Sequence, residues 1–181
     1  MHIACHAFVG HRLLCAGPLV EVAVAARSAI PGEPILVFDD ATGKVIDLDL
    51  SGSEEEVSAR YFDDEEATEA RGRGRPKLGV VGREVTLLPR HWGWLASQPG
   101  GASVALRKLV DAARKQTEQA DRERAARDRA YRFLHAIGGD LPDFEAASRA
   151  LFAADRKGLD ACLADWPEDV VAYVDELLAG A

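Results

Sequence analysis

The feature that most constrains the fold is a long stretch without helix-breaking residues. Neither glycine nor proline occurs between Ala102 and Ile137, which permits a single helix of roughly 50 Å at ~1.5 Å per residue. Residues 114–129 have only alanines as apolar residues. Acidic residues precede arginines there at i, i+4 spacing, in the pairs Glu118/Arg122, Glu123/Arg127 and Asp128/Arg132, which stabilises an exposed helix. A helix that is polar on all sides either crosses solvent between two folded parts or is not stable.

Charge is distributed unevenly along the chain. The 181 residues have a formal net charge of −8. Residues 71–132 nevertheless contain 15 Lys+Arg against six Asp+Glu, a net charge of +9, while residues 1–70 carry −10 and residues 133–181 carry −7. A polyanion responds to the local sign of the charge rather than to the average. The middle segment therefore predicts binding to a nucleic acid.

Composition and cysteine count place the chain among soluble proteins of a reducing compartment. The 48% hydrophobic and 29% charged content is typical of an ordinary folded protein. No apolar run is long enough to span a membrane, and no secretion signal is recognisable at the N-terminus. Cys5, Cys15 and Cys162 are an odd number without close pairing, which favours free thiols. We expect a cytoplasmic protein without a membrane partner.

Residues 1–50 predict a small mixed α/β domain. Two short apolar runs flank Gly10 and His11, as in a tight hairpin. Apolar residues then recur at helical spacing from Pro18 to Ile30. Two further strands flank the turn at residues 40–43 and extend to Leu50. The predicted element order is β-β-α-β-β.

Residues 51–78 are expected to form a charged linker. Ser53 is placed to cap a short helix that extends through Phe62. An acidic run at residues 63–66 and a basic run at residues 71–77 follow, with almost no large apolar side chain. Such a composition buries no core of its own.

The linker contains the sequence Arg73-Gly74-Arg75-Pro76, which resembles the core of an AT-hook. The resemblance implies that Arg73 and Arg75 enter a narrow A·T minor groove, whose negative potential attracts arginine. Lys77 follows directly and adds a further positive charge. The alternative interpretation is an ordinary arginine- and glycine-rich linker.

Residues 79–115 predict a strand, a helix and a second helix. The strand candidate is residues 83–88, the first helix begins at Pro89, and Ser103 is placed to cap the second after Gly100 and Gly101. This pattern resembles the ribbon-helix-helix family. The resemblance implies an obligate homodimer, because a two-stranded ribbon alone cannot bury its inner face.

In that family the ribbon enters the major groove and the second helices hold phosphates. The DNA-contacting residues implied here are Arg83, Thr86, Arg90, Ser103, Arg107 and Lys108. The strand departs from the family pattern, because its groove-facing positions include Val85 and Leu87, which read base edges poorly. A plain helical hairpin packed on the rest of the protein is the alternative. For Trp92 and Trp94 we expect a place in the core or in the dimer contact.

Residues 116–181 predict the end of the long polar helix and a C-terminal helical domain. Apolar residues at helical spacing indicate helices after Pro142, around Leu159 and after Pro167. Together the segments predict an α+β fold that is mainly helical. Its parts are a small N-terminal β-β-α-β-β unit, a central strand-helix-helix and C-terminal helices.

Sequence patterns of catalysis and of metal binding are weak in this chain. No nucleotide-binding loop, nucleophile elbow or metalloprotease motif occurs, so we expect no enzyme, no catalytic residue and no cofactor. Zinc-binding side chains gather near the N-terminus, but their spacing does not match a closed four-ligand site; they are His2, Cys5, His6, His11 and Cys15. Asp47 and Asp49 could share Mg²⁺, although a solvated strand face is the simpler interpretation. We therefore expect no metal.

Several longer runs resemble the signature of an uncharacterised bacterial family of unknown function. They are residues 74–80, 83–92 and 98–103, with further similarity at residues 38–43, 149–152 and 166–167. The resemblance covers nearly the whole chain and implies a cytoplasmic bacterial protein with this layout. It implies no activity and no catalytic residue.

The sequence thus favours a dimeric DNA-binding protein, as a transcriptional regulator or a nucleoid-associated factor. The alternative is a protein-interaction adaptor whose basic segment binds an acidic partner, or the chain's own acidic ends.

Overall fold

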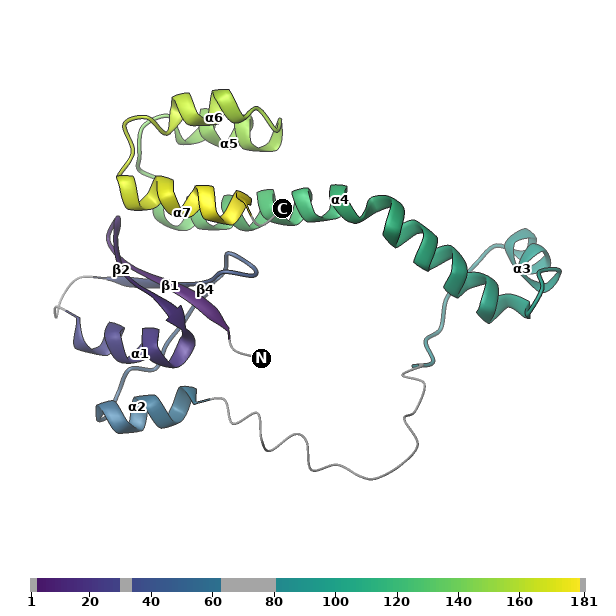
Figure 1. Cartoon of the computed structure of the whole chain (residues 1–181), viewed down its shortest axis with the longest axis horizontal. Coiled ribbons are helices and arrows are strands. Elements are labelled where there is room, and N and C mark those ends of the chain that lie inside the picture. The colour runs from purple at the N-terminus through teal and green to yellow at the C-terminus, as the bar shows by residue number, and fades with distance from the viewer. Residues whose placement is uncertain (1–2, 30–33, 63–80, 180–181) are drawn as a thin grey trace. The chain divides into compact units, whose positions relative to one another are not determined.

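The computed structural model of the chain describes residues 3–29, 34–62 and 81–179 (Figure 1). It forms two compact units. The first comprises residues 1–64 and 121–181 and is called the sheet unit. The second comprises residues 65–120 and is called the hairpin unit. The fold is α+β and mainly helical, as the sequence predicts.

The sheet has four antiparallel strands in the order β2-β1-β3-β4. They are β1 (Ala4–Val9), β2 (Arg12–Pro18), β3 (Ile35–Asp39) and β4 (Val45–Ile46). The first hairpin turns at Gly10, whose φ of +56° is a left-handed conformation that glycine adopts without strain. The predicted β-β-α-β-β order is confirmed. The last strand ends at Ile46 rather than at Leu50.

Alternation along β1 directs its side chains to opposite faces of the sheet. Cys5 and Ala7 belong to a core cluster with Val22 of α1 (Leu19–Ser28). The predicted start of this helix at Pro18 is confirmed to within one residue, since Pro18 precedes its first turn. The short helix α2 (Glu54–Tyr61) packs against α1 and buries Val57.

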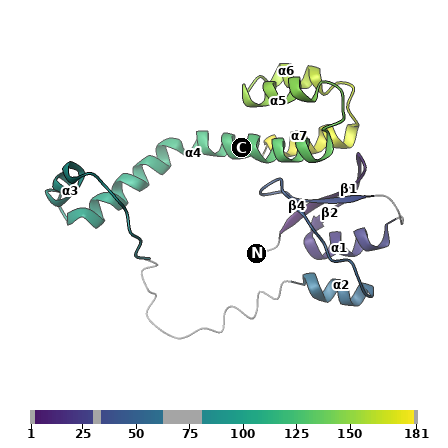
Figure 2. The ribbon, with the colours of Figure 1, turned by 180° about the vertical axis from the view of Figure 1, so that it is seen from behind.

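The opposite face of the sheet is covered by helices from the C-terminal half of the chain (Figure 2). Phe8 of β1 and Phe38 of β3 pack against Phe133 of α4 and Tyr173 of α7. Two of these helices, α4 (Gly101–Ile137) and α7 (Glu168–Ala179), lie against the sheet. The other two, α5 (Phe144–Phe152) and α6 (Arg156–Cys162), pack on the side of α4 and α7 that faces away from the sheet. The sheet unit is therefore layered, with α1 on one face of the sheet and α4 with α7 on the other.

Local signals set the helix ends in this unit as predicted. Ser53 caps α2 by accepting a hydrogen bond from the Glu56 amide, and the Glu56 carboxylate accepts one from the Ser53 amide. This reciprocal pair is a capping box. The three C-terminal helices also lie where the sequence places them, after Pro142, around Leu159 and after Pro167.

The hairpin unit contains α3 (Pro89–Ala96) and the first part of α4. The predicted cap at Ser103 is wrong. Helix α4 begins two residues earlier, at Gly101, because Gly100 and Gly101 both have positive φ and turn the chain there. The long helix itself is confirmed, since α4 continues without interruption to Ile137.

The strand predicted at residues 83–88 does not occur in the single chain, where these residues have neither strand nor helix assignment. A strand needs a hydrogen-bonded neighbour, and the described residues of this chain provide none for this segment. A ribbon that forms between two copies stays a prediction. No helix among the described residues is long and apolar enough to cross a membrane.

Candidate functional site

The residues predicted to contact DNA are all exposed where the structure describes them. Arg83 and Thr86 lie in the segment before α3, and Arg90 lies in the first turn of α3. Ser103, Arg107 and Lys108 lie in the first two turns of α4. Arg73, Arg75 and Lys77 lie outside the described residues.

Four cations of the hairpin unit are not neutralised by neighbouring acids. Arg83, Arg90, Arg107 and Lys108 form no ion pair or hydrogen bond with any described carboxylate. Residues 81–120 contain six Lys+Arg against three Asp+Glu, a net charge of +3. These side chains are accessible to an anionic partner.

Two arginines at the end of the basic segment, which lies in the sheet unit, are bound internally. The Arg129 guanidinium donates a hydrogen bond to the Leu177 carbonyl at 2.7 Å. The Arg132 guanidinium donates to the Thr42 carbonyl at 2.8 Å. These two arginines join α4 to α7 and to the turn after β3, so they hold the fold together, whereas the hairpin-unit cations face solvent.

The hairpin unit also exposes large apolar side chains. Of the twelve exposed large hydrophobic residues in the described chain, seven fall in this unit: Val81, Val85, Leu88, Trp92, Trp94, Leu109 and Val110. Its described part buries only Leu95 and Ala105. Apolar surface concentrated in this way commonly marks an interaction site.

Trp92 and Trp94 are therefore not core residues of the single chain. Their exposed fractions are 42% and 51%. They belong to α3, a helix of eight residues in which only Leu95 is buried. The alternative part of the prediction, a place in a dimer contact, stays a prediction.

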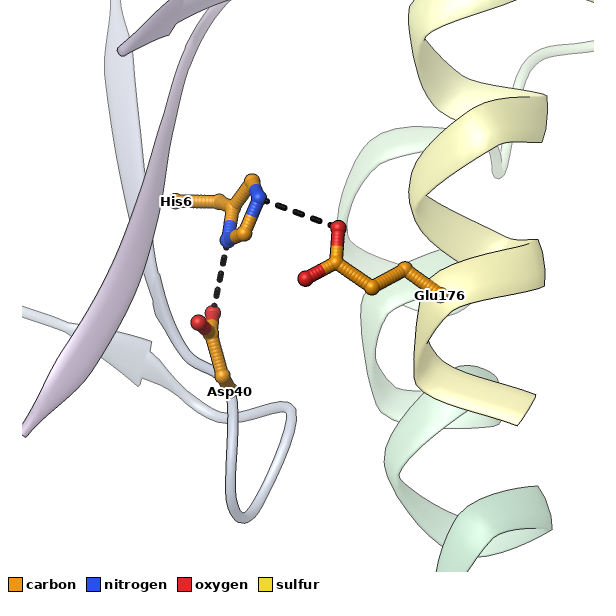
Figure 3. Close-up of side chains that lie close together, drawn as sticks. All are labelled: His6, Asp40 and Glu176. Atoms are coloured by element: carbon orange, nitrogen blue, oxygen red, sulfur yellow. Dashed lines mark hydrogen bonds and ion pairs between the residues drawn. The ribbon is translucent and has the colours of Figure 1, made fainter. Parts of the chain in front are cut away.

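A second cluster, in the sheet unit, brings together polar side chains from three elements (Figure 3). His6 lies on β1, Asp40 in the turn after β3, and Glu176 on α7. The His6 Nδ1 atom lies 2.9 Å from Asp40 Oδ1, and its Nε2 atom lies 3.3 Å from Glu176 Oε2. The His6 and Tyr173 rings stack with centroids 4.2 Å apart. We call His6, Asp40 and Glu176 the His6 cluster.

Burial decreases across this cluster from one end to the other. The His6 side chain is 10% exposed, the Asp40 side chain 24% and the Glu176 side chain 61%. The Tyr173 hydroxyl donates to the same Asp40 oxygen at 2.7 Å. The imidazole is thus held on three sides, and its Nε2 atom faces the carboxylate that is open to solvent.

Two other groups near Asp40 remain protonated at neutral pH. Burial, together with the hydrogen bond to Asp40, raises the pKa of Tyr173 well above its ordinary value. Burial, with a smaller contribution from the Asp40 and Asp39 charges, raises the pKa of Cys5 to about 12. Cys5 is therefore a neutral thiol at neutral pH.

The structure separates the potential zinc ligands named from the sequence. The His11 Nε2 atom lies 2.9 Å from the Ile137 carbonyl oxygen. Cys5 points to the α1 face of the sheet, opposite to His6, and His2 lies outside the described residues. Of that set, only His6 joins a group of potential ligands in the described chain, and its companions are two carboxylates.

Sequence reasoning missed the His6 cluster because its members are separated by up to 170 positions. Alternation in β1 does place His6 and Phe8 on one face, which was a usable signal. The partners on that face depend on which helix covers it, and no local pattern specifies that Glu176 does so.

The comparison with protein families then identifies the chain at the family level. Residues 4–178 match a family described as an uncharacterized protein conserved in bacteria, DUF2239. The chain belongs to this family. The match confirms the resemblance noted from the sequence runs, and it extends over both units. No curated protein and no solved structure matches the chain.

Proposed function

We propose that this protein binds duplex DNA as a homodimer, through the hairpin unit. The observation that carries the proposal is the set of outward-facing cations, Arg83, Arg90, Arg107 and Lys108, which no described carboxylate neutralises. Lysine and arginine in this state gain affinity for DNA by releasing counterions from phosphates. The same unit carries the AT-hook-like run with Arg73, Arg75 and Lys77, which would add minor-groove contacts.

The homodimer is supported by the apolar surface of the same unit. Seven large hydrophobic side chains are exposed there, and only Leu95 and Ala105 are buried in its described part. A second copy offers an identical apolar surface and a second strand for residues 83–88, which the single chain lacks. The proposal further assigns the protein to the bacterial cytoplasm, which suits its three free cysteines.

A salt series on the full-length protein tests DNA binding. Four phosphate contacts per copy give eight per dimer, and a slope of log affinity against log salt of about −7. Affinity for a 30-base-pair duplex, measured by fluorescence anisotropy, should therefore fall about 10⁴-fold between 50 and 200 mM salt. Light scattering on the free protein should give twice the chain mass of 19.5 kDa.

Two matched double variants localise the contact. Arg107→Gln with Lys108→Gln removes two hairpin-unit cations per copy and should reduce the salt slope by about half. Arg149→Gln with Lys157→Gln removes two exposed cations from α5 and α6 of the sheet unit and should leave the slope unchanged.

Equal slopes for the two variants, or no binding at 50 mM salt, would overturn the proposal. The adaptor alternative predicts that a polyglutamate peptide, rather than the duplex, binds the wild-type protein and is lost in the Arg107/Lys108 variant. A mass equal to one chain would overturn the homodimer.

A further inference from the structure

The His6 cluster has an arrangement that a divalent transition-metal ion completes. Asp40 lies against His6 Nδ1, and the Nε2 atom is directed toward Glu176 (Figure 3). Tyr173 stacks on the same ring. We propose that His6 Nε2 and the Glu176 carboxylate bind Zn²⁺ or a similar ion, with water filling the remaining positions. Asp40 then acts as a positioning residue that holds the ring.

The spacing of the two ligand atoms agrees with this geometry. Zinc binds nitrogen at about 2.0–2.1 Å and oxygen at about 2.0–2.2 Å in a tetrahedron, which places neighbouring ligand atoms about 3.4 Å apart. The Nε2 and Oε2 atoms lie 3.3 Å apart. The two side chains could therefore bind one ion without rearrangement of β1 or α7.

Asp40 supplies the support that metal-bound histidines generally have. A ligating imidazole usually donates its second N–H to a carboxylate, which sets the tautomer and raises the basicity of the ligating nitrogen. The His6 Nδ1 atom lies 2.9 Å from Asp40 Oδ1, which provides this contact. The stacked Tyr173 ring restricts rotation of the imidazole in addition.

The charges and ligand types favour a doubly charged transition metal. Two ionised carboxylates flank one imidazole, so the cluster with a neutral ring carries a charge of −2, which one divalent ion neutralises. One nitrogen and one carboxylate suit Zn²⁺, Ni²⁺ or Cu²⁺, whereas Mg²⁺ and Ca²⁺ prefer oxygen ligands alone. Cys5 would not contribute, because it lies on the opposite face of the sheet, and the Tyr173 hydroxyl is directed to Asp40.

The competing occupant is a proton. If His6 is doubly protonated, its Nε2–H donates directly to Glu176 and the cluster is an internal ion pair. A metal ion would replace that proton, so the two states differ in whether Nε2 carries hydrogen or metal.

Zinc titration of the full-length protein by calorimetry tests the site. Glu176→Gln, at an exposed position, removes one ligand without exposing the core and should weaken zinc binding at least tenfold. Glu168→Gln, on an exposed side chain of the same helix, should leave zinc affinity unchanged. Asp40→Asn should weaken it by about 10–100-fold through loss of the supporting contact, and Mg²⁺ should not bind at this site.

Nitrogen-15 NMR of the imidazole rings gives a second readout, which a purely structural role would not produce. Saturating zinc should give His6 with Nδ1 protonated and Nε2 bound to metal. A proton retained on Nε2 at saturating zinc, or equal zinc affinity in the Glu176 and Glu168 variants, would overturn the proposal. Loss of all zinc binding in a His11→Asn variant would also overturn the proposal. DNA binding plays no part in either measurement.

Discussion

The two units of this protein use the same kinds of side chain in opposite ways. In the sheet unit, aromatic rings from β1, β3, α4 and α7 pack together, and Arg129 and Arg132 are bonded to backbone carbonyls. In the hairpin unit, Trp92 and Trp94 are exposed, and Arg107 and Lys108 have no acidic partner among the described residues. The sheet unit buries its aromatic side chains, whereas the described part of the hairpin unit leaves large apolar and cationic side chains exposed.

The difference shows that residue type alone does not assign a role. Arginines at positions 107 and 129 lie on the same helix and in the same basic segment. Arg129 becomes structural because α7 passes close enough to offer a carbonyl. Arg107 is exposed, and its side chain forms no ion pair or hydrogen bond with the described residues.

The largest effect on stability is expected from a side chain added where the turn after β3 packs on α4. Gly43 has a φ of +66°, and a side chain there would place its Cβ 2.1 Å from the Arg129 carbonyl oxygen. Gly43→Ala should lower the free energy of unfolding by about 3 kcal/mol, from left-handed strain and a steric clash together. Urea denaturation measures this loss.

Gly10→Ala is the matched control for this substitution. Gly10 has a similar φ of +56° but no atom within 4 Å of the added Cβ. Only the backbone strain of about 1–2 kcal/mol should remain. Equal losses in the two variants would show that the turn does not pack on α4 in solution.

A smaller effect per pH unit is expected at alkaline pH, and only in the sheet unit. The ordinary pKa of a cysteine thiol is 9.0, and burial raises that of Cys5 to about 12. The folded chain keeps a proton that the unfolded chain loses, so this contribution to stability is complete below pH 9 and is lost as the pH rises toward 12. The free energy of unfolding should fall by up to about 1.4 kcal/mol per pH unit for this group.

Cys5→Ala should reduce that slope in urea denaturation carried out at several pH values. Residues 65–120 contain neither cysteine nor tyrosine. Thiol ionisation should therefore not lower the protection of hairpin-unit amides against exchange. An unchanged slope in the variant would mean that Cys5 is not buried as the structure shows.

The smallest effect is expected at Gly93 in α3. A Cβ added there meets no atom within 4 Å, and alanine favours a helix over glycine by about 0.8–1.0 kcal/mol. Gly93→Ala should therefore stabilise the hairpin unit slightly, which amide exchange of α3 can detect. A loss of stability would instead reveal a surface packed closely against this position in solution, as a tight dimer contact would produce.

Much of the fold was predictable because its signals are local. The Gly10 turn, the Ser53 cap and the run without glycine or proline up to Ile137 depend on local sequence, and the structure confirms them. Predictions failed where the outcome depends on neighbours. The Ser103 cap is displaced by the two glycines before it, and residues 83–88 lack a strand to pair with in the single chain.

The candidate sites divide in the same way. The exposed positions of Arg83, Arg90 and Arg107 follow from their charge, because arginine is rarely buried without a partner. The His6 cluster does not follow from any local pattern, because β1, the turn after β3 and α7 meet only through the packing of Phe8, Phe38 and Tyr173.

By itself, the sequence determined the strand and helix order of the sheet unit, the unbroken length of α4 and the positive charge of the middle segment. These properties depend on backbone propensity, periodicity and composition, which act over short distances. Tertiary structure alone decided which arginines are bound internally, which tryptophans stay exposed and which carboxylates meet His6. Those outcomes depend on contacts between residues far apart in the chain, and packing of the folded layers creates such contacts.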